Sequence, residues 1–424
     1  MANTFATSTV VVKLMTMHLW EALVMARTVN RQVGSLVTGN YRTGGSVKIK
    51  KPIESRVNTG ATITTVDDVY QRSITMTCTT RKNTNFQLTA EQLTYQMLTT
   101  EVSEEIIKPK MRALAHAIES DLLDLYKKIP NQVGTPGTTP SSTKVIRQAR
   151  ERMTFMGAPQ EDCHCVLDPS AVTEIGENMK SLLHAPMVEE AVQGTPINGQ
   201  LKVPIAGMKC YESVNVKRHT VGTAQGDTLL IKTNSSEEDT TIDIKGGTSG
   251  NTLLEGDIWT VGATGQCMAC NPSDGTAYTF QRQFVTRADD TVDASTNMDA
   301  HTCIPGTDPY KIRGSGATQL EYQNMAGSSG DGLPDADDAV TVAGTAGTSY
   351  AISMAYPRNA IALATLPLHM PNTAGFKARR DFEGISIRVV ADYDVKNDLE
   401  IYRCDILYGV DVLEPFACCR IIGA

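Results

Sequence analysis

Residues 101–129 carry the longest helical periodicity in the sequence, and this run limits the folds open to the chain. Large apolar residues recur along it at Val102, Ile106, Met111, Leu114, Ile118, Leu122, Leu125 and Ile129. This spacing puts one apolar stripe along a helix. A straight helix of about 29 residues would span roughly 43 Å. We therefore expect a spine against which other parts of the chain pack.

Several residues of this run predict local detail. Pro109 lacks a backbone donor, so it should kink the helix or mark its first turn. Glu104 with Lys108, and Asp124 with Lys128, stand four residues apart and predict ion pairs worth a few tenths of a kcal/mol each. His116 has no carboxylate at ligand spacing and is predicted to lie on the helix surface.

Two elements are predicted ahead of the spine. Residues 8–30 have the periodicity of an amphipathic helix, which either packs on its own core or reaches a neighbouring molecule. Both ends of residues 46–80 alternate between apolar and polar side chains, as strands do. The polar stretch 56–70 between them fits a long two-stranded arm. Because a long exposed hairpin is unstable alone, something outside the monomer should cover it.

The region after the spine predicts a second core of mixed type. Residues 130–140 are rich in Pro and Gly and predict a loop, followed by a helix over 143–156. Cys163–Leu167 predicts a short buried strand, and Asp168-Pro169-Ser170 starts another helix. This helix–strand–helix order is typical of α and β elements packed together.

Near Thr223 the composition shifts to Gly, Thr, Asp and Ser, and helical periodicity is lost until about Tyr350. Short strands are predicted at 228–233, 257–261 and 278–287. We interpret this stretch as an inserted all-β domain. After it, 351–368 is mostly apolar, alternation resumes at Ile385, a turn is expected over 394–398, and 401–412 predicts a return strand. The predicted fold class is α+β.

Charge and cysteine usage exclude some classes of protein. Acidic residues outnumber basic ones, 47 to 39, for a formal charge of −8. A dedicated nucleic-acid binder needs a basic excess, whereas a container for DNA does not. Ten scattered cysteines imply no disulfide framework. The first thirty residues lack a secretory signal and no stretch is apolar enough to cross a membrane, so we expect synthesis in a reducing cytoplasm and no membrane partner.

No catalytic or cofactor motif is found. Cys267 and Cys270, with His301 downstream, are the weak candidates for a zinc site. Cys303 is too close to His301 to serve easily as a further ligand, so no metal is expected. The acidic residues Asp331, Asp335, Asp337 and Asp338 miss the calcium-loop spacing. There is no phosphate-binding loop, no Gly-x-Ser-x-Gly segment and no histidine constellation. We expect no catalytic residue, no cofactor and no enzyme.

The order of these parts resembles the major capsid proteins of tailed double-stranded-DNA bacteriophages. More narrowly, it resembles the coat-protein family of short-tailed Salmonella-type phages, whose shell fold carries an insertion domain. The segments that resemble the insertion strands are EGDIWTV at 255–261, CNP at 270–272 and FQRQFVT at 280–286. Ala206-Gly207 and LYGV at 407–410 resemble its flanks. The Cys267/Cys270 pair and the acidic loop before Tyr350 depart from the family.

The resemblance implies the tailed-phage major capsid fold with a small inserted all-β domain. The implied divisions are an N-terminal arm at 1–45, an extended β-hairpin arm at 46–80, a peripheral domain at 81–142 with 391–424, an axial domain at 143–222 with 350–390, and the insertion at 223–349. The arm residues expected at subunit interfaces are Lys48, Lys50, Lys51, Glu54, Arg56, Asp67, Asp68 and Arg72.

It also implies a function: pentamers and hexamers that assemble in the bacterial host cytoplasm into an icosahedral procapsid and then a mature virion shell. The implied partners are copies of the chain, a scaffolding protein, a portal protein and, as a further candidate, a decoration protein. Packaged double-stranded DNA would lie nearby. The alternatives are another structural protein, such as a tail tube or adhesin, and a zinc-dependent enzyme built on Cys267, Cys270 and His301.

Overall fold

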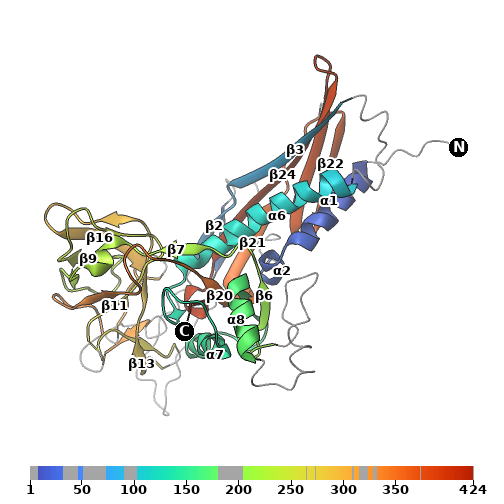
Figure 1. Cartoon of the computed structure of the whole chain (residues 1–424). Coiled ribbons are helices and arrows are strands. Elements are labelled where there is room, and N and C mark those ends of the chain that lie inside the picture. The colour runs from blue at the N-terminus through green and yellow to red at the C-terminus, as the bar shows by residue number, and fades with distance from the viewer. Residues whose placement is uncertain are drawn as a thin grey trace, which may run out of the picture.

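The chain has an elongated body of helices and sheets with a β-rich part at one end (Figure 1). The computed structural model describes residues 8–31, 46–50, 73–89, 103–179, 204–263, 265–272, 274–307, 310–314, 323–327, 332–372 and 374–423. Within these ranges, helices and strands both contribute, so the α+β class is confirmed. None of the described helices is long and apolar enough to span a membrane.

The spine is present as one helical run with three geometries. A π-helical turn, η1 (Ser103–Ile107), leads into α6 (Lys108–Leu123) and ends in a 3-10 turn, η2 (Asp124–Lys128). Pro109 stands in the first turn of α6, the second of the two predicted outcomes. The predicted apolar stripe is buried from Met111 to Ile129, whereas Ile106 is half-buried and Val102 lies outside the described residues.

One predicted ion pair of the spine is wrong. Lys128 Nζ contacts Asp411 Oδ1 at 2.6 Å, whereas Asp124 Oδ2 pairs with Lys127 Nζ at 3.3 Å. The reason is the 3-10 geometry of η2, which has three residues per turn and so aligns residues three apart. The side chain of Glu104, from the other predicted pair, lies outside the described residues. His116 is exposed, as predicted.

The N-terminal segment packs on the spine of its own chain. It forms α1 (Ser8–Ala22) and a short α2 (Met25–Thr28), so the predicted single helix to residue 30 is wrong. The break is filled by Glu119 of α6, whose buried carboxylate accepts hydrogen bonds from the backbone N–H groups of Val24, Met25 and Ala26, each at 2.9 Å. Because these three N–H groups donate to Glu119, they do not form the hydrogen bonds that would continue α1 as one helix.

The largest sheet of the body lies against α1 and α6. Its strands are β3 (Thr80–Thr89), β21 (Ile361–Leu366), β22 (Phe376–Phe382), β23 (Ile385–Asp394) and β24 (Leu399–Val412). β24 pairs with β3 along one side and with β23 and β21 along the other. The predicted C-terminal hairpin is therefore confirmed as β23 and β24. A separate antiparallel pair, β1 (Ser46–Lys50) and β2 (Ser73–Thr77), confirms the strands at the two ends of the arm.

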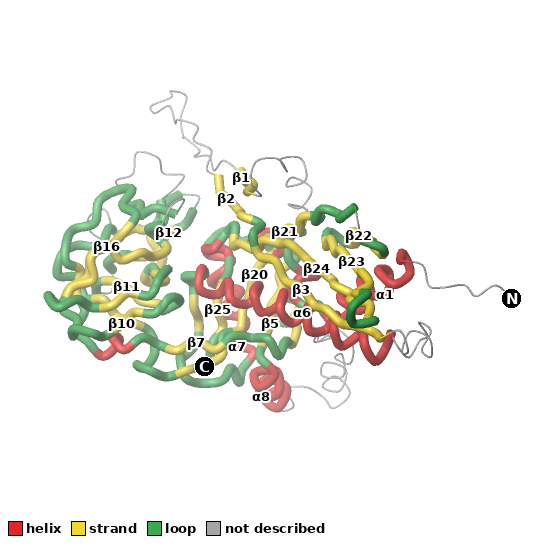
Figure 2. The backbone as a smooth tube through the Cα atoms, turned by 90° about the horizontal axis from the view of Figure 1, so that it is seen from above, coloured by secondary structure: helices red, strands yellow, loops and turns green. Residues whose placement is uncertain are grey.

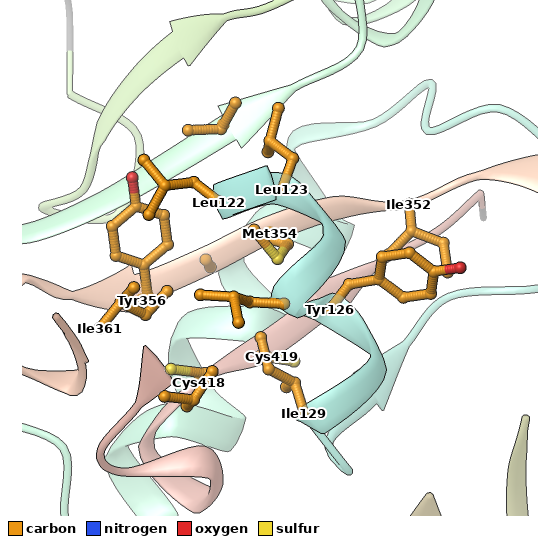
Figure 3. Packing of buried hydrophobic residues seen from close by; sticks show 14 of the residues in the cluster. Leu122, Leu123, Tyr126, Ile129, Ile352, Met354, Tyr356, Ile361, Cys418 and Cys419 are labelled. Atoms are coloured by element: carbon orange, nitrogen blue, oxygen red, sulfur yellow. The ribbon is translucent and has the colours of Figure 1, made fainter. Parts of the chain in front are cut away.

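A second sheet packs against the C-terminal end of the spine. Its order is β4 (Gln132–Val133), β25 (Cys419–Ile421), β20 (Ser353–Pro357), β5 (Cys163–Leu167) and β6 (Lys209–Glu212), flanked by α7 (Thr143–Phe155) and α8 (Pro169–Met179). Figure 3 shows Leu122 and Tyr126 of the spine in one cluster with Met354 and Cys419 of this sheet and with Cys418, which precedes β25. The apolar run 351–368 supplies strands to both sheets, because the 3-10 turn η5 (Arg358–Ala360) separates β20 from β21.

Residues 223–349, which we call the β-rich segment, form several small sheets. The largest has the order β18-β11-β14-β16-β9-β8, and a second has the order β13-β12-β17. The bounds are η3 (Thr223–Gly226), β8 (Leu230–Ile231), β9 (Thr241–Lys245), β10 (Thr252–Leu253), β11 (Ile258–Val261), β12 (Met268–Cys270), β13 (Ala277–Gln281), β14 (Phe284–Thr286), β15 (Asp290–Thr291), β16 (Asn297–Ile304), β17 (Met325–Ala326) and β18 (Val340–Val342). At its ends, β7 (Arg218–Thr220) pairs with β19 (Ser349–Ala351).

The predicted strand over 278–287 is wrong as a single element. It is divided into β13 and β14, which belong to different sheets. Arg282 and Gln283 stand between them, and both side chains bind the body of the molecule. Contacts with the body therefore determine where the strand is interrupted. The alternation of apolar and polar residues cannot predict this interruption.

Candidate functional site

Only two of the eight interface residues expected in the arm lie in the described part of the chain. Lys48 and Lys50 are on β1, opposite Thr75 and Ser73 of β2, on the exposed face of that pair. Ile74 of β2 is buried on the other face. Lys51, Glu54, Arg56, Asp67, Asp68 and Arg72 lie outside the described residues.

The weak zinc candidates are not brought together as a ligand set. His301 is on β16, and its two ring nitrogens lie 2.8 Å from Asp290 Oδ2 and 3.2 Å from Thr286 Oγ1. Cys270 is in another sheet, donates to the Gln323 carbonyl, and has its pKa raised to about 11 by burial, which disfavours the thiolate that zinc needs. Among the described residues, no group of three or more His, Cys, Asp or Glu side chains could hold a metal.

A buried polar cluster joins the β-rich segment to the spine. His219 Nε2 lies 2.8 Å from Asp257 Oδ1, and His219 Nδ1 lies 3.2 Å from Tyr126 Oη at the end of the spine. Because an ionised carboxylate only accepts, Nε2 carries the proton in this pair. Asp257 also accepts from the backbone N–H groups of Gly222 and Leu254. The Asp257 carboxylate thus joins the entry to the β-rich segment, at Gly222, to the turn between β10 and β11.

Arg420 of β25 completes this cluster from the body. Its guanidinium is fully buried, donates through Nη1 to the Gly256 carbonyl at 2.6 Å, and lies over the Tyr126 ring at 5.1 Å. Burial lowers the pKa of Arg420 to about 10, with nearby Tyr126 and Tyr350 opposing that shift. The side chain therefore stays charged at neutral pH. A buried charge held by one carbonyl and one ring is costly to separate from them.

A second contact lies along the edge of β4. The side-chain amide of Gln283 accepts from the backbone N–H of Gln132 at 2.7 Å and donates to the Gln132 carbonyl at 3.2 Å. Next to it, the buried guanidinium of Arg282 lies 3.8 Å from the centre of the Phe416 ring. Burial lowers the pKa of Arg282 to about 10. Both side chains come from the break between β13 and β14.

The rim of the junction is held by more exposed groups. Glu255 pairs with Lys127 of the spine at 3.4 Å and with Arg287 at 3.2 Å. On the α7 side, Tyr278 Oη donates to the Phe155 carbonyl at 2.7 Å. Partly exposed ion pairs of this kind contribute under about 1 kcal/mol each. The buried cluster and the amide pair therefore fix the position of the β-rich segment.

No sequence pattern predicts a site at His219, Asp257 or Arg420. Asp257 lies in the EGDIWTV segment, which carried a resemblance but no role, and the other two follow no periodic pattern. Their partners are far away along the chain. Nothing in this cluster presents a nucleophile to solvent, because each of its side chains is buried. The arrangement can hold two parts of the molecule together, and we find no further chemistry in it.

A family model described as P22 coat protein, gene protein 5, matches residues 1–423. A search of curated proteins by sequence finds no match.

Several solved structures are similar over most of their length. One from Mycobacterium phage Che8 has a TM-score of 0.45 at 12% identity, covering 94% of this chain and 90% of that one. The capsid of Ralstonia phage GP4 has a TM-score of 0.42 at 8% identity, covering 87% and 80%. The capsid of the cyanophage P-SCSP1u has a TM-score of 0.40 at 10% identity, covering 90% and 84%.

Proposed function

Since this chain belongs to the P22 coat protein family and is a major capsid protein that forms the icosahedral shell of a phage virion, we propose that it assembles as pentamers and hexamers that enclose the packaged genome. The family match over residues 1–423 is the observation that carries this proposal. Such a protein is structural and is not an enzyme. Its formal charge of −8 suits a wall that must not adhere to densely packed phosphates.

We further propose how the subunit is divided into domains. Residues 1–45 form an N-terminal arm, 46–80 an extended arm, 81–142 with 391–424 a peripheral domain, 143–222 with 350–390 an axial domain, and 223–349 an insertion domain. The separate sheets of the β-rich segment support the last division. The buried cluster of Asp257, His219 and Tyr126 supports an insertion that is fixed to the spine.

The arm is proposed to lie over a neighbouring subunit. Lys48 and Lys50 support this, because they project from β1 into solvent. The arm charges named above would then meet opposite charges across the boundary. A scaffolding protein, a portal protein and a decoration protein are proposed partners, and assembly is proposed to occur in the host cytoplasm.

The mechanism follows from weak contacts that are repeated many times. An interface of about 1,000 Å² often gives only micromolar affinity. Each misplaced subunit can therefore leave. Once several neighbours hold the same subunit, the effective concentration makes dissociation of the closed shell rare.

Negative-stain electron microscopy tests this proposal directly. The purified chain would be imaged alone and after co-expression with its neighbouring genes. Closed, uniform polyhedral shells are expected. Rings or fibres would favour a tube or adhesin, and dispersed subunits under every condition would contradict the proposal.

A charge reversal tests the arm separately. Lys48→Glu with Lys50→Glu should lower the yield of closed shells, because both new carboxylates would face the acidic groups that the lysines met. The unfolding midpoint of the unassembled subunit should stay unchanged, since both side chains are exposed. An unchanged yield would exclude these two lysines from the interface.

A further inference from the structure

The sheet β4-β25-β20-β5-β6 places two cysteines opposite each other on neighbouring strands. β5 and β6 run parallel, and their register pairs Cys165 directly with Cys210. Figure 2 shows β5 near β20 and β25 in the body, with α7 next to them. Among the strand pairings in the described part of the chain, only this one has two cysteines as direct partners.

The separation of the two strands suits a disulfide bond. Neighbouring strands lie about 4.8 Å apart, and cysteines in disulfides have Cα atoms about 4.4 to 6.8 Å apart. The two thiols already share a side-chain hydrogen bond. Both side chains are fully buried. Bond formation therefore needs rotation of the two side chains and no change in the strand register.

Two further cysteines of this sheet are less suited to the bond. Cys419 of β25 pairs with Ala355 of β20, and Ala355 pairs with Cys165. Two strand spacings, about 9.6 Å, therefore separate Cys419 from Cys165, which is too far for a disulfide. Cys163 stands two residues before Cys165 on β5, and its thiol donates to the Pro159 carbonyl at 3.2 Å. The sheet thus favours one pair among its cysteines.

The hydrogen bond makes the two thiols chemically unequal. Cys165 donates to the Cys210 sulfur, and this bond lowers the pKa of Cys210 in spite of its burial. A backbone hydrogen bond from Ile205 lowers it further. Burial alone acts in the opposite direction, as at Cys404, where burial beside Asp405 raises the pKa to about 12. Because the thiolate is the nucleophile, Cys210 is the thiol that reacts first.

β6 is also the strand at which a small reagent can reach the pair. It stands at the end of the strand order, so it pairs on one side only. Its pairing with β5 is parallel, and parallel pairs are slightly less stable than antiparallel ones. A strand held in this way opens locally at less cost than a central strand. Opening of β6 uncovers Cys210 while β5 stays paired with β20.

We propose that Cys165 and Cys210 are an oxidation site, at which a peroxide forms a disulfide that fastens β6 to β5. The Cys210 thiolate attacks one oxygen of hydrogen peroxide, the O–O bond breaks, and the departing hydroxide takes up a proton to become water. The Cys165 thiol then displaces the hydroxyl group of the Cys210 sulfenic acid, which leaves as a second water. Two thiols lose two electrons and two protons, and one peroxide gains them.

The bond would stabilise the subunit. It closes the chain between residues 165 and 210 into a loop, which removes conformational freedom from the unfolded state. A reducing host cytoplasm keeps the two thiols reduced, and the bond forms once the shell has left that compartment. This timing rests on the proposed function, whereas the bond itself does not.

Mass spectrometry of the full-length chain tests the bond. Hydrogen peroxide is added until exposed Met17 is converted to its sulfoxide, which shows that the oxidant was effective. Remaining thiols are alkylated in urea, and the chain is digested with trypsin without reduction. Peptide 153–180 should be joined to peptide 210–217 through Cys165, and dithiothreitol should separate the two. Free thiols at both positions, or a bond to another cysteine, would overturn the proposal.

Variants separate this pair from the other buried thiols of the sheet. Cys163→Ala and Cys419→Ala should keep the cross-link, whereas Cys210→Ala should abolish it. Loss of the cross-link in Cys163→Ala would instead assign the bond to Cys163 and overturn the pairing.

Urea unfolding tests the effect on stability. The oxidised wild-type chain is compared with the same sample after dithiothreitol, which reduces the disulfide but not methionine sulfoxide. The oxidised chain should unfold at a higher urea concentration, and in Cys210→Ala the two midpoints should coincide. Equal midpoints in wild type would show that the bond does not fasten β6. A chain that forms the bond but never forms shells contradicts the proposed function alone.

Discussion

Two buried carboxylates in the body are stabilised in opposite ways. Glu119, on the helical side of the molecule, accepts hydrogen bonds from three backbone N–H groups. Burial raises its pKa despite those donors and nearby Arg27. Asp405, on the open face of the sheet, is also buried, but hydrogen bonds from Arg388, Arg403 and Arg81 outweigh burial and lower its pKa. Backbone N–H dipoles therefore hold the Glu119 side chain, whereas charged guanidinium groups hold the Asp405 side chain.

The difference shows what each carboxylate is suited to do. Glu119 is surrounded by its own chain, and all its partners lie in the N-terminal segment. It therefore fastens that segment to the spine. Asp405 has partners that also reach solvent, so it organises a surface. We expect loss of Glu119 to destabilise the subunit more than loss of Asp405 does.

The largest expected effect is from Glu119→Ala. Removing the carboxylate leaves three buried N–H groups without an acceptor, at about 1 to 3 kcal/mol each before the structure relaxes. We expect a loss of about 4 kcal/mol in the free energy of unfolding, measured by urea denaturation of unassembled subunits. Glu105→Ala, an exposed glutamate in the same helical run, should change it by under about 0.5 kcal/mol. Equal effects would show that Glu119 does not fasten the N-terminal segment.

Asp405→Asn should have a smaller effect. The amide keeps the size of the side chain but removes the charge that three guanidinium groups share. Arg81 and Arg403 can hydrate, since nearly half of each side chain is exposed, and only Arg388 is left poorly solvated. We expect a loss of about 2 kcal/mol, with Asp381→Asn on the same sheet as the control. A loss as large as that of Glu119→Ala would contradict the contrast drawn here.

The smallest expected effect is a pH slope whose sign differs between the sites. Glu119 has a raised folded pKa, so the folded state binds its proton more tightly and wild type loses stability relative to Glu119→Gln as pH rises above about 4.3. Asp405 has a lowered folded pKa, so wild type loses stability relative to Asp405→Asn as pH falls below about 3.9. Urea titrations across this range measure both slopes. Slopes of the same sign would refute the comparison.

The sequence predicts those elements that depend on residues close together in the chain. The spine, the strand Cys163–Leu167 and the C-terminal hairpin follow from periodicity, and the structure has all three. Glu119 could not be predicted in this way. It stands in an ordinary Glu-Ser-Asp sequence, and its partner Val24 is 95 residues away. Its presence ends α1 early, so the boundary of one element depends on a side chain in another.

Long-range charge contacts were missed for the same reason. Arg420 reads as a polar interruption of an apolar C-terminal run, yet it is fully buried and binds the Gly256 carbonyl. The cluster of Asp405 with Arg388, Arg403 and Arg81 depends on register among three strands, which no single strand contains. The arm residues beyond Lys50 lie outside the described residues, so their role stays a prediction.

The amide pair between Gln283 and Gln132 has a consequence for a protein that reaches high local concentration. β4 lies at the end of its sheet, and an open strand edge can recruit a strand from another molecule and grow without limit. Here the Gln132 N–H and C=O are both bound by one side chain of the same chain. Crowded subunits therefore cannot extend the sheet at Gln132, which favours ordered closure over amyloid-like aggregation.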